Sequence, residues 1–499
     1  MSGVLDSLRS LSNRSGKLDE SLKRFLRGIK PEIWLILILI FALSLRLYFF
    51  VGPNINDDVD YVFSAHEVSE GRFYPLYGKS INAIRSMMTA PVALFFKIFG
   101  VGIYSASIYP IVCSLITIVS VFYIGKILVD YKVGLVSAAI LSFYPVDIVF
   151  STQLVPTTPV TAFVTLGLLL FLYGEKMEKK LTLFVLSGVM IGLSYLANIM
   201  TFFIVASIAF SYLAINRKIR KEYLLIALGF LLVFSGETLF MYANTGNPWH
   251  RLDVFHETER MIGTNTDMNY YQRVMLKVEG VNFNAQEGNL GIFVYLFIVA
   301  SLFALGYEPE KKLWFLIVSF FLIMSYFQFG VMTAGFKPIA KWVRYLIVLG
   351  PVFSLLIGYM FEKVTKKAYL KIILVALFFS LTLPFIIGSA QAYRSWTEEF
   401  TVEYDYLKGL PEKTVYTDQG SLGFLQFYFG YEWDIKILEK SKLEDIKDSY
   451  VILDGSRGVV QNAVMRENLP DFAKNPPKEW KLLAVLESWA VSPKIYYAP

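Results

Sequence analysis

The sequence predicts a helical protein that crosses a membrane many times and carries a small external α/β domain. Of the 499 residues, 55% are hydrophobic and 18% are charged, and the mean hydropathy is +0.50, which is too apolar for a soluble domain. The apolar residues form long runs, each near the roughly 20 residues that a helix needs to cross about 30 Å of hydrocarbon. The single cysteine, Cys113, lies inside one such run, so the sequence contains no disulfide framework.

Eleven segments are expected to span the membrane. They cover approximately residues 33–51, 105–125, 133–147, 156–174, 181–197, 199–215, 223–243, 290–307, 313–332, 342–361 and 369–388. The run between the basic stretches GEKMEKK (174–180) and NRKIRKE (216–222) is divided into two spans, because both stretches indicate the cytosolic face. The same argument divides the run between DYK (130–132) and GEKMEKK, and its proline-rich tip, 144–159, is expected outside.

The distribution of Lys and Arg predicts the orientation. These residues gather in alternate connecting segments, which should therefore be cytosolic: 1–32, 126–132, 174–180, 216–222, 308–312 and 362–371. The net charge of +6 is thus mainly an orientation signal, and no nucleic-acid partner is expected. The polar N-terminus lacks the features of a cleavable signal and should remain attached. We expect a multi-pass plasma-membrane protein with a cytosolic segment (1–32), a membrane domain (33–390) and an extracytoplasmic domain (391–499).

The last part of the chain has a different pattern. Four short β-favouring runs, TVYTDQG, IKILEK, SYVILDG and KLLAVLES, are separated by polar and glycine-containing stretches. The run YVILDG reads as a buried strand followed by a loop. No Gly-rich phosphate loop follows any of these strands, so a nucleotide-binding domain is not indicated.

Three carboxylates stand close together after the first expected span. The external loop 52–104 begins GPNINDDVDYVF and contains Asp57, Asp58 and Asp60. Apolar residues three to four apart indicate a helix on the membrane surface here, and PVALFFKIFG (91–100) indicates a second one. The carboxylates could simply cap the helix. They could also supply a base, because mutual repulsion raises the pKa of a carboxyl group.

Cations that could bind a phosphate are expected near the outer interface. The candidates are Lys79, Arg85, Arg251 and Arg344. Arginine can grip phosphate through two parallel hydrogen bonds. The alternative for each is anchoring to lipid headgroups.

Two further features leave other functions open. NPWHRLDVFHETER (247–260) contains two histidines six residues apart with nearby acids, so a divalent metal ion is an open possibility, although surface histidines without metal are favoured. Glu237 is a carboxylate inside an expected span, which would suit a transporter. The acidic residues nevertheless cluster in the external loop.

The loop also resembles a known family. The sequence has an Asp-Asp pair after the first span, a Tyr three residues on, an Ala four later and a Gly near mid-loop, namely Asp57, Asp58, Tyr61, Ala65 and Gly71. This order resembles the first external loop of GT-C glycosyltransferases, specifically the protein O-mannosyltransferase and aminoarabinose lipid A transferase group. FYPVDIVFSTQLVPTTP is similar to that group's second external loop, and KWVRYLIVLGPVFSLL to its Arg-Tyr stretch. The likeness covers about residues 33–390.

The resemblance implies a function and roles for individual residues. It implies transfer of a sugar from a polyprenyl-phosphate carrier to a protein, glycan or lipid acceptor outside the membrane, with inversion. Asp57 would be the base and Asp58 its acidic neighbour. The substrate-binding candidates are Asp60, Tyr61, Lys79, Arg85, Asp147, Arg251, Arg344 and Tyr345. Thr157 stands where many relatives have a carboxylate, which weakens the match in the second loop.

Two other functions are weighed against this one. The first is a transporter or flippase of lipid-linked sugars, which would depend on Glu237. The second is a ligase that uses a lipid-diphosphate donor.

Overall fold

The structure is a computed structural model of the whole chain. It describes residues 30–54, 57–72, 81–177, 180–217, 219–261, 267, 269–277, 288–307, 311–329 and 341–499. The chain forms two compact units. The first, here called the membrane unit, contains Met1–Phe50, Pro110–Ser151 and Val155–Ser389, and the second, the loop-tail unit, contains Val51–Tyr109, Thr152–Leu154 and Ala390–Pro499.

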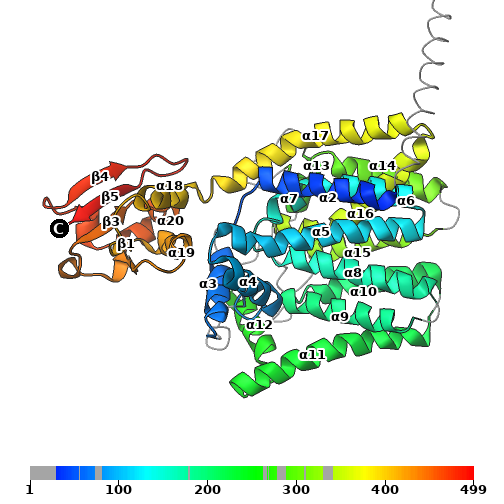
Figure 1. The fold of residues 1–499 in the computed structure, drawn as a ribbon, viewed down its shortest axis with the longest axis horizontal. Coiled ribbons are helices and arrows are strands. Elements are labelled where there is room, and N and C mark those ends of the chain that lie inside the picture. Colours follow the sequence, from blue (N-terminus) through cyan, green and yellow to red (C-terminus); the bar gives the residue numbers. More distant parts are fainter. Residues whose placement is uncertain are drawn as a thin grey trace, which may run out of the picture. The chain divides into compact units, whose positions relative to one another are not determined.

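Helices account for most of the membrane unit (Figure 1). Their bounds are α2 Pro31–Tyr48, α5 Ile103–Leu128, α6 Tyr131–Ser142, α7 Pro145–Phe150, α8 Thr157–Lys176, α9 Thr182–Ala197, α10 Thr201–Asn216, α11 Leu224–Thr245, α12 His250–Met261, α13 Tyr270–Leu276, α14 Phe293–Tyr307, α15 Trp314–Phe329, α16 Gly350–Val364 and α17 Ala368–Arg394. The 3₁₀ turns η2 Lys221–Tyr223 and η3 Val343–Leu349 lead into α11 and α16. The first residues of α5 and the last of α17 belong to the loop-tail unit.

Every segment expected to span the membrane contains a helix. Within the described ranges, six helices are long and apolar enough to cross, at Pro31–Tyr48, Ile103–Leu128, Thr157–Lys176, Lys221–Thr245, Val343–Val364 and Ala368–Arg394. The remaining expected spans are shorter apolar helices, namely α6, α9, α10, α14 and α15. A multi-pass helical membrane protein is therefore confirmed, while the number of crossings stays a prediction.

Glycines allow some of these helices to approach closely. A Cβ added at Gly188 of α9 would lie 1.9 Å from the carbonyl oxygen of Ile226 in α11, and one at Gly229 would lie 2.0 Å from the carbonyl oxygen of Val185. Small residues at helix contacts are typical of membrane bundles, where tight packing drives association. The α9–α11 contact therefore depends on two glycines, each of which faces the backbone of the other helix.

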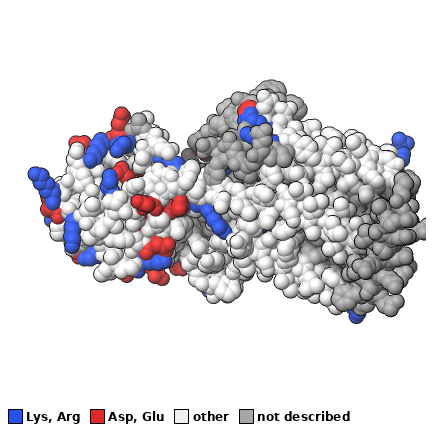
Figure 2. All heavy atoms as spheres, turned by 90° about the horizontal axis from the view of Figure 1, so that it is seen from above, with Lys and Arg blue, Asp and Glu red and all other residues white. Residues whose placement is uncertain are grey.

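The surface of the membrane unit is apolar. Large side chains on several helices are exposed, including Leu232, Leu302 and Phe210 at 59%, 66% and 63%. In the face shown in Figure 2, broad white areas cover the helical bundle, and charged side chains gather on the residues that follow it in the chain. Exposed apolar side chains on helices are what a lipid environment requires.

The loop-tail unit contains the two helices expected in the first external loop. They are α3 Asp57–Ser69 and α4 Ser86–Phe99. After α17 come α18 Glu398–Leu407 and α19 Gln419–Tyr428, followed by the short helices α20 Arg457–Gln461, α21 Ala463–Glu467 and α22 Asp471–Lys474. The turns η4 Leu438–Lys440 and η5 Leu443–Asp445 complete the helical elements.

A mixed five-stranded sheet forms the centre of the tail. Its strands are β1 Val415–Thr417, β2 Ile435–Ile437, β3 Ser449–Leu453, β4 Lys481–Val485 and β5 Lys494–Ala498, in the order β2-β1-β3-β5-β4. The strand β1 pairs in parallel with β2 and β3, whereas β5 pairs antiparallel with β3 and β4. The strand β3, the centre of the sheet, is buried along its whole length, as YVILDG predicted.

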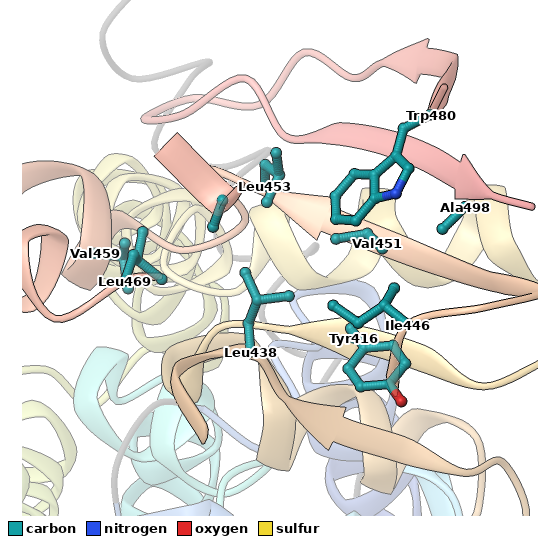
Figure 3. Close-up of a cluster of buried hydrophobic side chains, with 10 residues drawn as sticks. Tyr416, Leu438, Ile446, Val451, Leu453, Val459, Leu469, Trp480 and Ala498 are labelled. Atoms are coloured by element: carbon teal, nitrogen blue, oxygen red, sulfur yellow. The ribbon is translucent and has the colours of Figure 1, made fainter. Parts of the chain in front are cut away.

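One face of the sheet packs into a closed hydrophobic core. Figure 3 shows Val451 and Leu453 of β3 in a cluster with Tyr416, Leu438 and Trp480. These residues come from strands and from the connections between them, and each is at most 8% exposed. The expected α/β domain is confirmed. It also contains a fifth strand, β5, which was not predicted from the sequence.

Candidate active site

Two of the three clustered aspartates share one hydrogen-bond donor. The side-chain amide Nδ2 of Asn82 lies 3.2 Å from Asp57 Oδ1 and 3.2 Å from Asp60 Oδ2. Asn82 is 6% exposed, Asp57 is half-buried and Asp60 is exposed. A buried amide that donates to both carboxylates fixes their positions. Asp57 is therefore fixed in position by the protein and is still partly accessible to solvent.

Asp58 has a different environment. It is 3% exposed, and its Oδ2 accepts hydrogen bonds from the backbone N–H of Asn54 at 2.6 Å and of Leu154 at 3.2 Å. Adjacent residues of a helix point about 100° apart, so the two aspartates of the pair reach different partners. Asp58 connects the segment before α3 to the segment between α7 and α8. Asp57 is the more accessible of the pair.

Arg85 closes this network. Its Nη1 donates to the hydroxyl of Tyr61 and, at 3.1 Å, to Asn82 Oδ1. Tyr61 is completely buried and Arg85 is half-buried. Carboxylates, an amide, a phenol and a guanidinium therefore lie together at the beginning of α3. Lys79, the other expected cation of this loop, lies outside the described residues.

The tail supports the helix that carries these aspartates. Gly423 of α19 faces Val59 of α3 so closely that an added Cβ would lie 2.6 Å from Val59 Cγ1. The ring of His66 stacks on Tyr431 with centroids 4.3 Å apart and an angle of 12° between the planes. Both contacts lie within the loop-tail unit. The position of α3 therefore depends on residues of the C-terminal tail.

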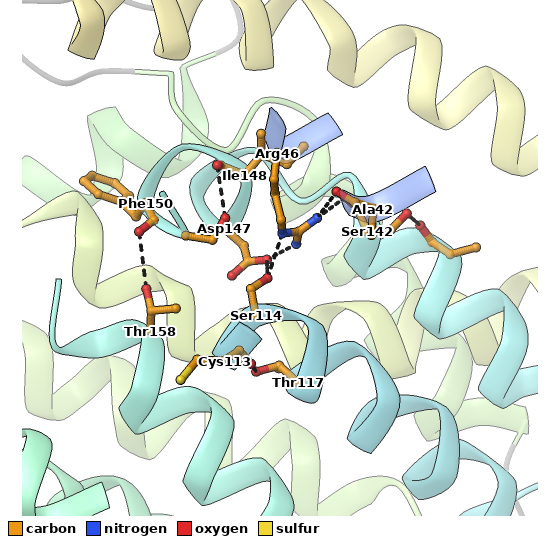
Figure 4. Close-up of polar contacts among 12 residues, drawn as sticks. Ala42, Arg46, Cys113, Ser114, Thr117, Ser142, Asp147, Ile148, Phe150 and Thr158 are labelled. Carbon is orange, nitrogen blue, oxygen red and sulfur yellow. Dashed lines mark hydrogen bonds and ion pairs between the residues drawn. The ribbon is translucent and has the colours of Figure 1, made fainter. Parts of the chain in front are cut away.

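In the membrane unit, Asp147 forms a buried ion pair with Arg46 (Figure 4). Asp147 Oδ2 accepts from the guanidinium of Arg46 and, at 2.6 Å, from Ser114 Oγ. Arg46 also donates to the carbonyl oxygens of Ala42 and Ser142 at 2.8 and 3.2 Å. This network joins α2, α5, α6 and α7. Its presence gives Asp147 a structural role beside the substrate-binding role predicted for it.

Arg251 of α12 is likewise held by the protein. Its Nη1 lies 2.6 Å from Glu237 Oε1, and its Nη2 lies 2.8 Å from the carbonyl oxygen of Tyr195. The guanidinium carbon is 4.7 Å from the centre of the Tyr195 ring. Arg251 therefore binds the last turn of α9 and neutralises Glu237. These contacts explain the carboxylate that the sequence places inside a span.

The Arg-Tyr stretch begins with another buried cation. Lys341 is 1% exposed and its Nζ donates to the carbonyl oxygen of Asp267 at 3.2 Å. Arg344 is half-buried, with its guanidinium carbon 5.3 Å from the Trp342 ring centre, and Tyr345 stacks on Phe327. Lys341, Arg344 and Tyr345 thus give the membrane unit a second group of cationic and phenolic side chains.

Several residues of these networks could not be predicted from the sequence. Asn82, Asn54 and Lys341 carry no recognisable pattern, because their partners are distant in sequence or in poorly patterned loops. Arg46 did carry a signal, since an arginine near the end of an apolar run requires a partner. Among the residues that the structure describes, no group of three or more His, Cys, Asp or Glu side chains could hold a metal ion. The histidines of α12 therefore offer no such group there.

Comparison with known proteins identifies a related family. The model of the family described as dolichyl-phosphate-mannose-protein mannosyltransferase matches residues 87–239. No curated protein sequence matches the chain. The family match begins just after the aspartate network and includes α7 with Asp147.

Solved structures extend the likeness over nearly the whole chain. ArnT from Cupriavidus metallidurans bound to undecaprenyl phosphate is 13% identical, with a TM-score of 0.56 over 93% of this chain and 98% of that one. The Archaeoglobus fulgidus oligosaccharyltransferase is 12% identical, with a TM-score of 0.51 over 92% and 74%. The mycobacterial arabinofuranosyltransferase AftD is 9% identical, with a TM-score of 0.50 over 94% and 40%. The GT-C resemblance predicted from the sequence is confirmed, and the chain has this fold.

Proposed function

We propose that this protein is an inverting glycosyltransferase. It moves a sugar from a polyprenyl-phosphate carrier to an acceptor hydroxyl on the outer face of the membrane. The observation that carries the proposal is Asp57, a half-buried carboxylate at the start of a helix, held by the buried Asn82 beside an arginine and a tyrosine. The proposal includes a location in the plasma membrane with the N-terminus cytosolic and the tail outside.

The chemistry needs a base and a stabilised leaving group. A hydroxyl becomes a competent nucleophile when a positioned carboxylate removes its proton, and Asp57 is assigned this role. The leaving lipid phosphate is already an anion, so cations can stabilise it without a protonated carboxyl group. Arg85 lies in the same network as Asp57 and is the described cation best placed for this contact. Asp58, held by two backbone amides, positions the base.

The comparisons support the substrate class. One matched structure is ArnT bound to undecaprenyl phosphate, and another is the archaeal oligosaccharyltransferase AglB with an inhibitory peptide and a dolichol-phosphate. Polyprenyl phosphates are therefore bound by proteins of this fold. The mannosyltransferase family model over residues 87–239 supports a sugar as the transferred group. We extend both features to this chain.

The alternative, a flippase of lipid-linked sugars, depended on Glu237. That carboxylate pairs with Arg251, at side-chain exposures of 6% and 9%. A buried ion pair of this kind gives Glu237 a structural reason to be there. The comparisons support the transferase instead.

The decisive experiment compares Asp57→Asn with Glu70→Gln. Glu70 is an exposed carboxylate of the same loop, so its amide variant controls for loss of charge. Membranes containing either variant are incubated with a panel of polyprenyl-phosphate sugars and assayed for carrier release. Asp57→Asn should abolish release and Glu70→Gln should preserve it. Undiminished turnover by Asp57→Asn would reject the assignment of the base.

A further inference from the structure

A groove runs along two helices of the membrane unit. It has a volume of about 640 Å³ and is lined by side chains of α5 and α8. Val112, Ile116 and Tyr123 line it from α5, and Leu166, Leu170 and Tyr173 from α8. The successive spacings of four and seven residues in α5, and of four and three residues in α8, place each set on one helix face. The volume lies within the range of about 300–1,000 Å³ that is usual for ligand pockets.

The chemistry of the groove changes along its length. Its middle is lined by aliphatic side chains, and the rings of Tyr123 and Tyr173 stand 6.5 Å apart toward the C-terminal ends of the two helices. One turn further, Lys126 lies in the last turn of α5 and Lys176 in the last turn of α8. The groove is lined by aliphatic side chains and two tyrosines, and a lysine follows in the last turn of each helix. This order along the helices matches an amphiphile with an apolar chain and an anionic head.

The lysines that follow the groove lie toward the N-terminal end of α2. Lys126 Nζ is 3.7 Å from Glu32 Oε1, at the first turn of α2, so these two side chains form an ion pair. The acidic loop follows the C-terminal end of α2 in the chain. We therefore assign to this groove a lipid other than the polyprenyl-phosphate donor proposed to react near Asp57.

A buried hydroxyl in the groove marks a polar position along the chain of the ligand. Ser120 is 1% exposed and lines the groove, and its Oγ has no hydrogen-bond partner in the structure. A hydroxyl without a partner in an apolar site is costly, so a ligand carbonyl here would compensate for it. Ser120 precedes Tyr123 by about one helical turn, the depth at which an acyl ester would lie below a headgroup held by Lys126.

We propose that this α5–α8 groove binds one acyl chain of an anionic phospholipid, with its phosphate at Lys126 and Lys176 and its ester carbonyl near Ser120. The site is independent of the proposed transferase chemistry. Negative headgroups attract lysines at a membrane surface, and an acyl chain fills the concave apolar face between the two helices.

The test is native mass spectrometry of the full chain in detergent. Phosphatidylglycerol or phosphatidylcholine is added in equal amounts, and the lipid-bound fraction is measured. Wild-type protein should retain phosphatidylglycerol preferentially. In the K126Q/K176Q double variant, the ratio of bound phosphatidylglycerol to bound phosphatidylcholine should fall roughly tenfold, because both headgroup cations are removed. Leu170→Trp should reduce retention of either lipid by filling the groove.

Controls separate occupancy from general lipid adhesion. Leu302→Trp adds the same bulk at an exposed position of α14 and should bind like wild type. Ile116→Phe fills the groove from the other helix and replaces Leu170→Trp if that variant does not fold. Equal binding of both lipids by wild type, or full retention by the filled variants, would overturn the proposal. Displacement of phosphatidylglycerol by undecaprenyl phosphate would also overturn it. None of these outcomes depends on sugar transfer.

Discussion

At the scale of single residues, Asn82 is the centre of the candidate site. Its amide nitrogen donates to two carboxylates and its amide oxygen accepts from Arg85. One side chain therefore connects the proposed base to the nearest described cation. Asn82 is buried, whereas Asp57 and Asp60 are more exposed, so its amide fixes the positions of these two carboxylates.

Replacing Asn82 with Ala should slow sugar transfer. The side-chain amide holds Asp57 and Asp60 and connects them to Arg85, so its loss leaves the proposed base less well positioned. The rate of carrier release at neutral pH should fall by roughly tenfold. A rate equal to that of wild type would show that the amide does not position the base.

A buried acid in the tail predicts a second pH effect. Glu403 of α18 is completely buried and neither carboxyl oxygen has a hydrogen-bond partner within 3.5 Å. Burial raises the pKa of Glu403 well above its usual value of 4.5, and the charges of Asp418 and Glu399 raise it further. The folded tail therefore holds a proton that the unfolded chain releases above about pH 4.5.

The stability of the tail should therefore fall as pH rises from about 4.5 toward the raised pKa of Glu403. Burial also raises the pKa values of Glu399 and Asp418, so these groups act in the same direction. Glu403→Gln should flatten this dependence and slow amide hydrogen exchange of β3 at pH 8. The exposed variant Glu412→Gln is the control. Identical exchange of wild type and Glu403→Gln at pH 8 would contradict a neutral Glu403.

At the scale of elements, the α9–α11 contact tests how closely the bundle is packed. Gly229→Ala would place a methyl group 2.0 Å from the backbone oxygen of Val185, which cannot move away without shifting α9. A loss of about 1–3 kcal/mol is expected from this overpacking. Gly236→Ala on the same helix meets nothing within 4 Å and should be neutral or slightly stabilising. Thermal unfolding of the purified variants distinguishes the two, and equal melting temperatures would refute the contact.

The Arg46–Asp147 pair makes a similar prediction for α2 and α7. Asp147→Asn removes the charge opposite a completely buried guanidinium, so a loss of about 3–5 kcal/mol is expected. The double variant Arg46→Met/Asp147→Leu removes both charges and should recover much of that loss. Thermal unfolding measures both effects. If the double variant were less stable than Asp147→Asn, the pair would contribute more than charge balance.

At the scale of the whole molecule, the sequence predicts elements better than it predicts contacts. Apolar runs and basic connections identified the helices because lipid imposes both patterns along the chain. The buried strand β3 was recognisable from YVILDG, whereas β5, KIYYA, follows an irregular segment and was not predicted. These elements follow from local composition.

The site was predicted only in part. Asp57 and Asp58 were recognised from their spacing and from the family resemblance. Their different environments depend on Asn82 and Leu154, which lie 25 and 96 residues away in the chain. Contacts over such distances leave no periodic pattern. The partners of Arg251 and Asp147 were hidden for the same reason, because each bonds a residue on another helix.

The contact of α3 with α19 has a consequence for biogenesis. The ribosome makes α3 early and α19 only after the last long helix of the membrane unit. Until then Val59 lacks the glycine surface against which it packs in the finished protein. The helix α3 is therefore synthesised well before the residues that complete its packing, which belong to the final hundred or so residues of the sequence. We therefore expect the proposed transferase activity to depend on the folded tail.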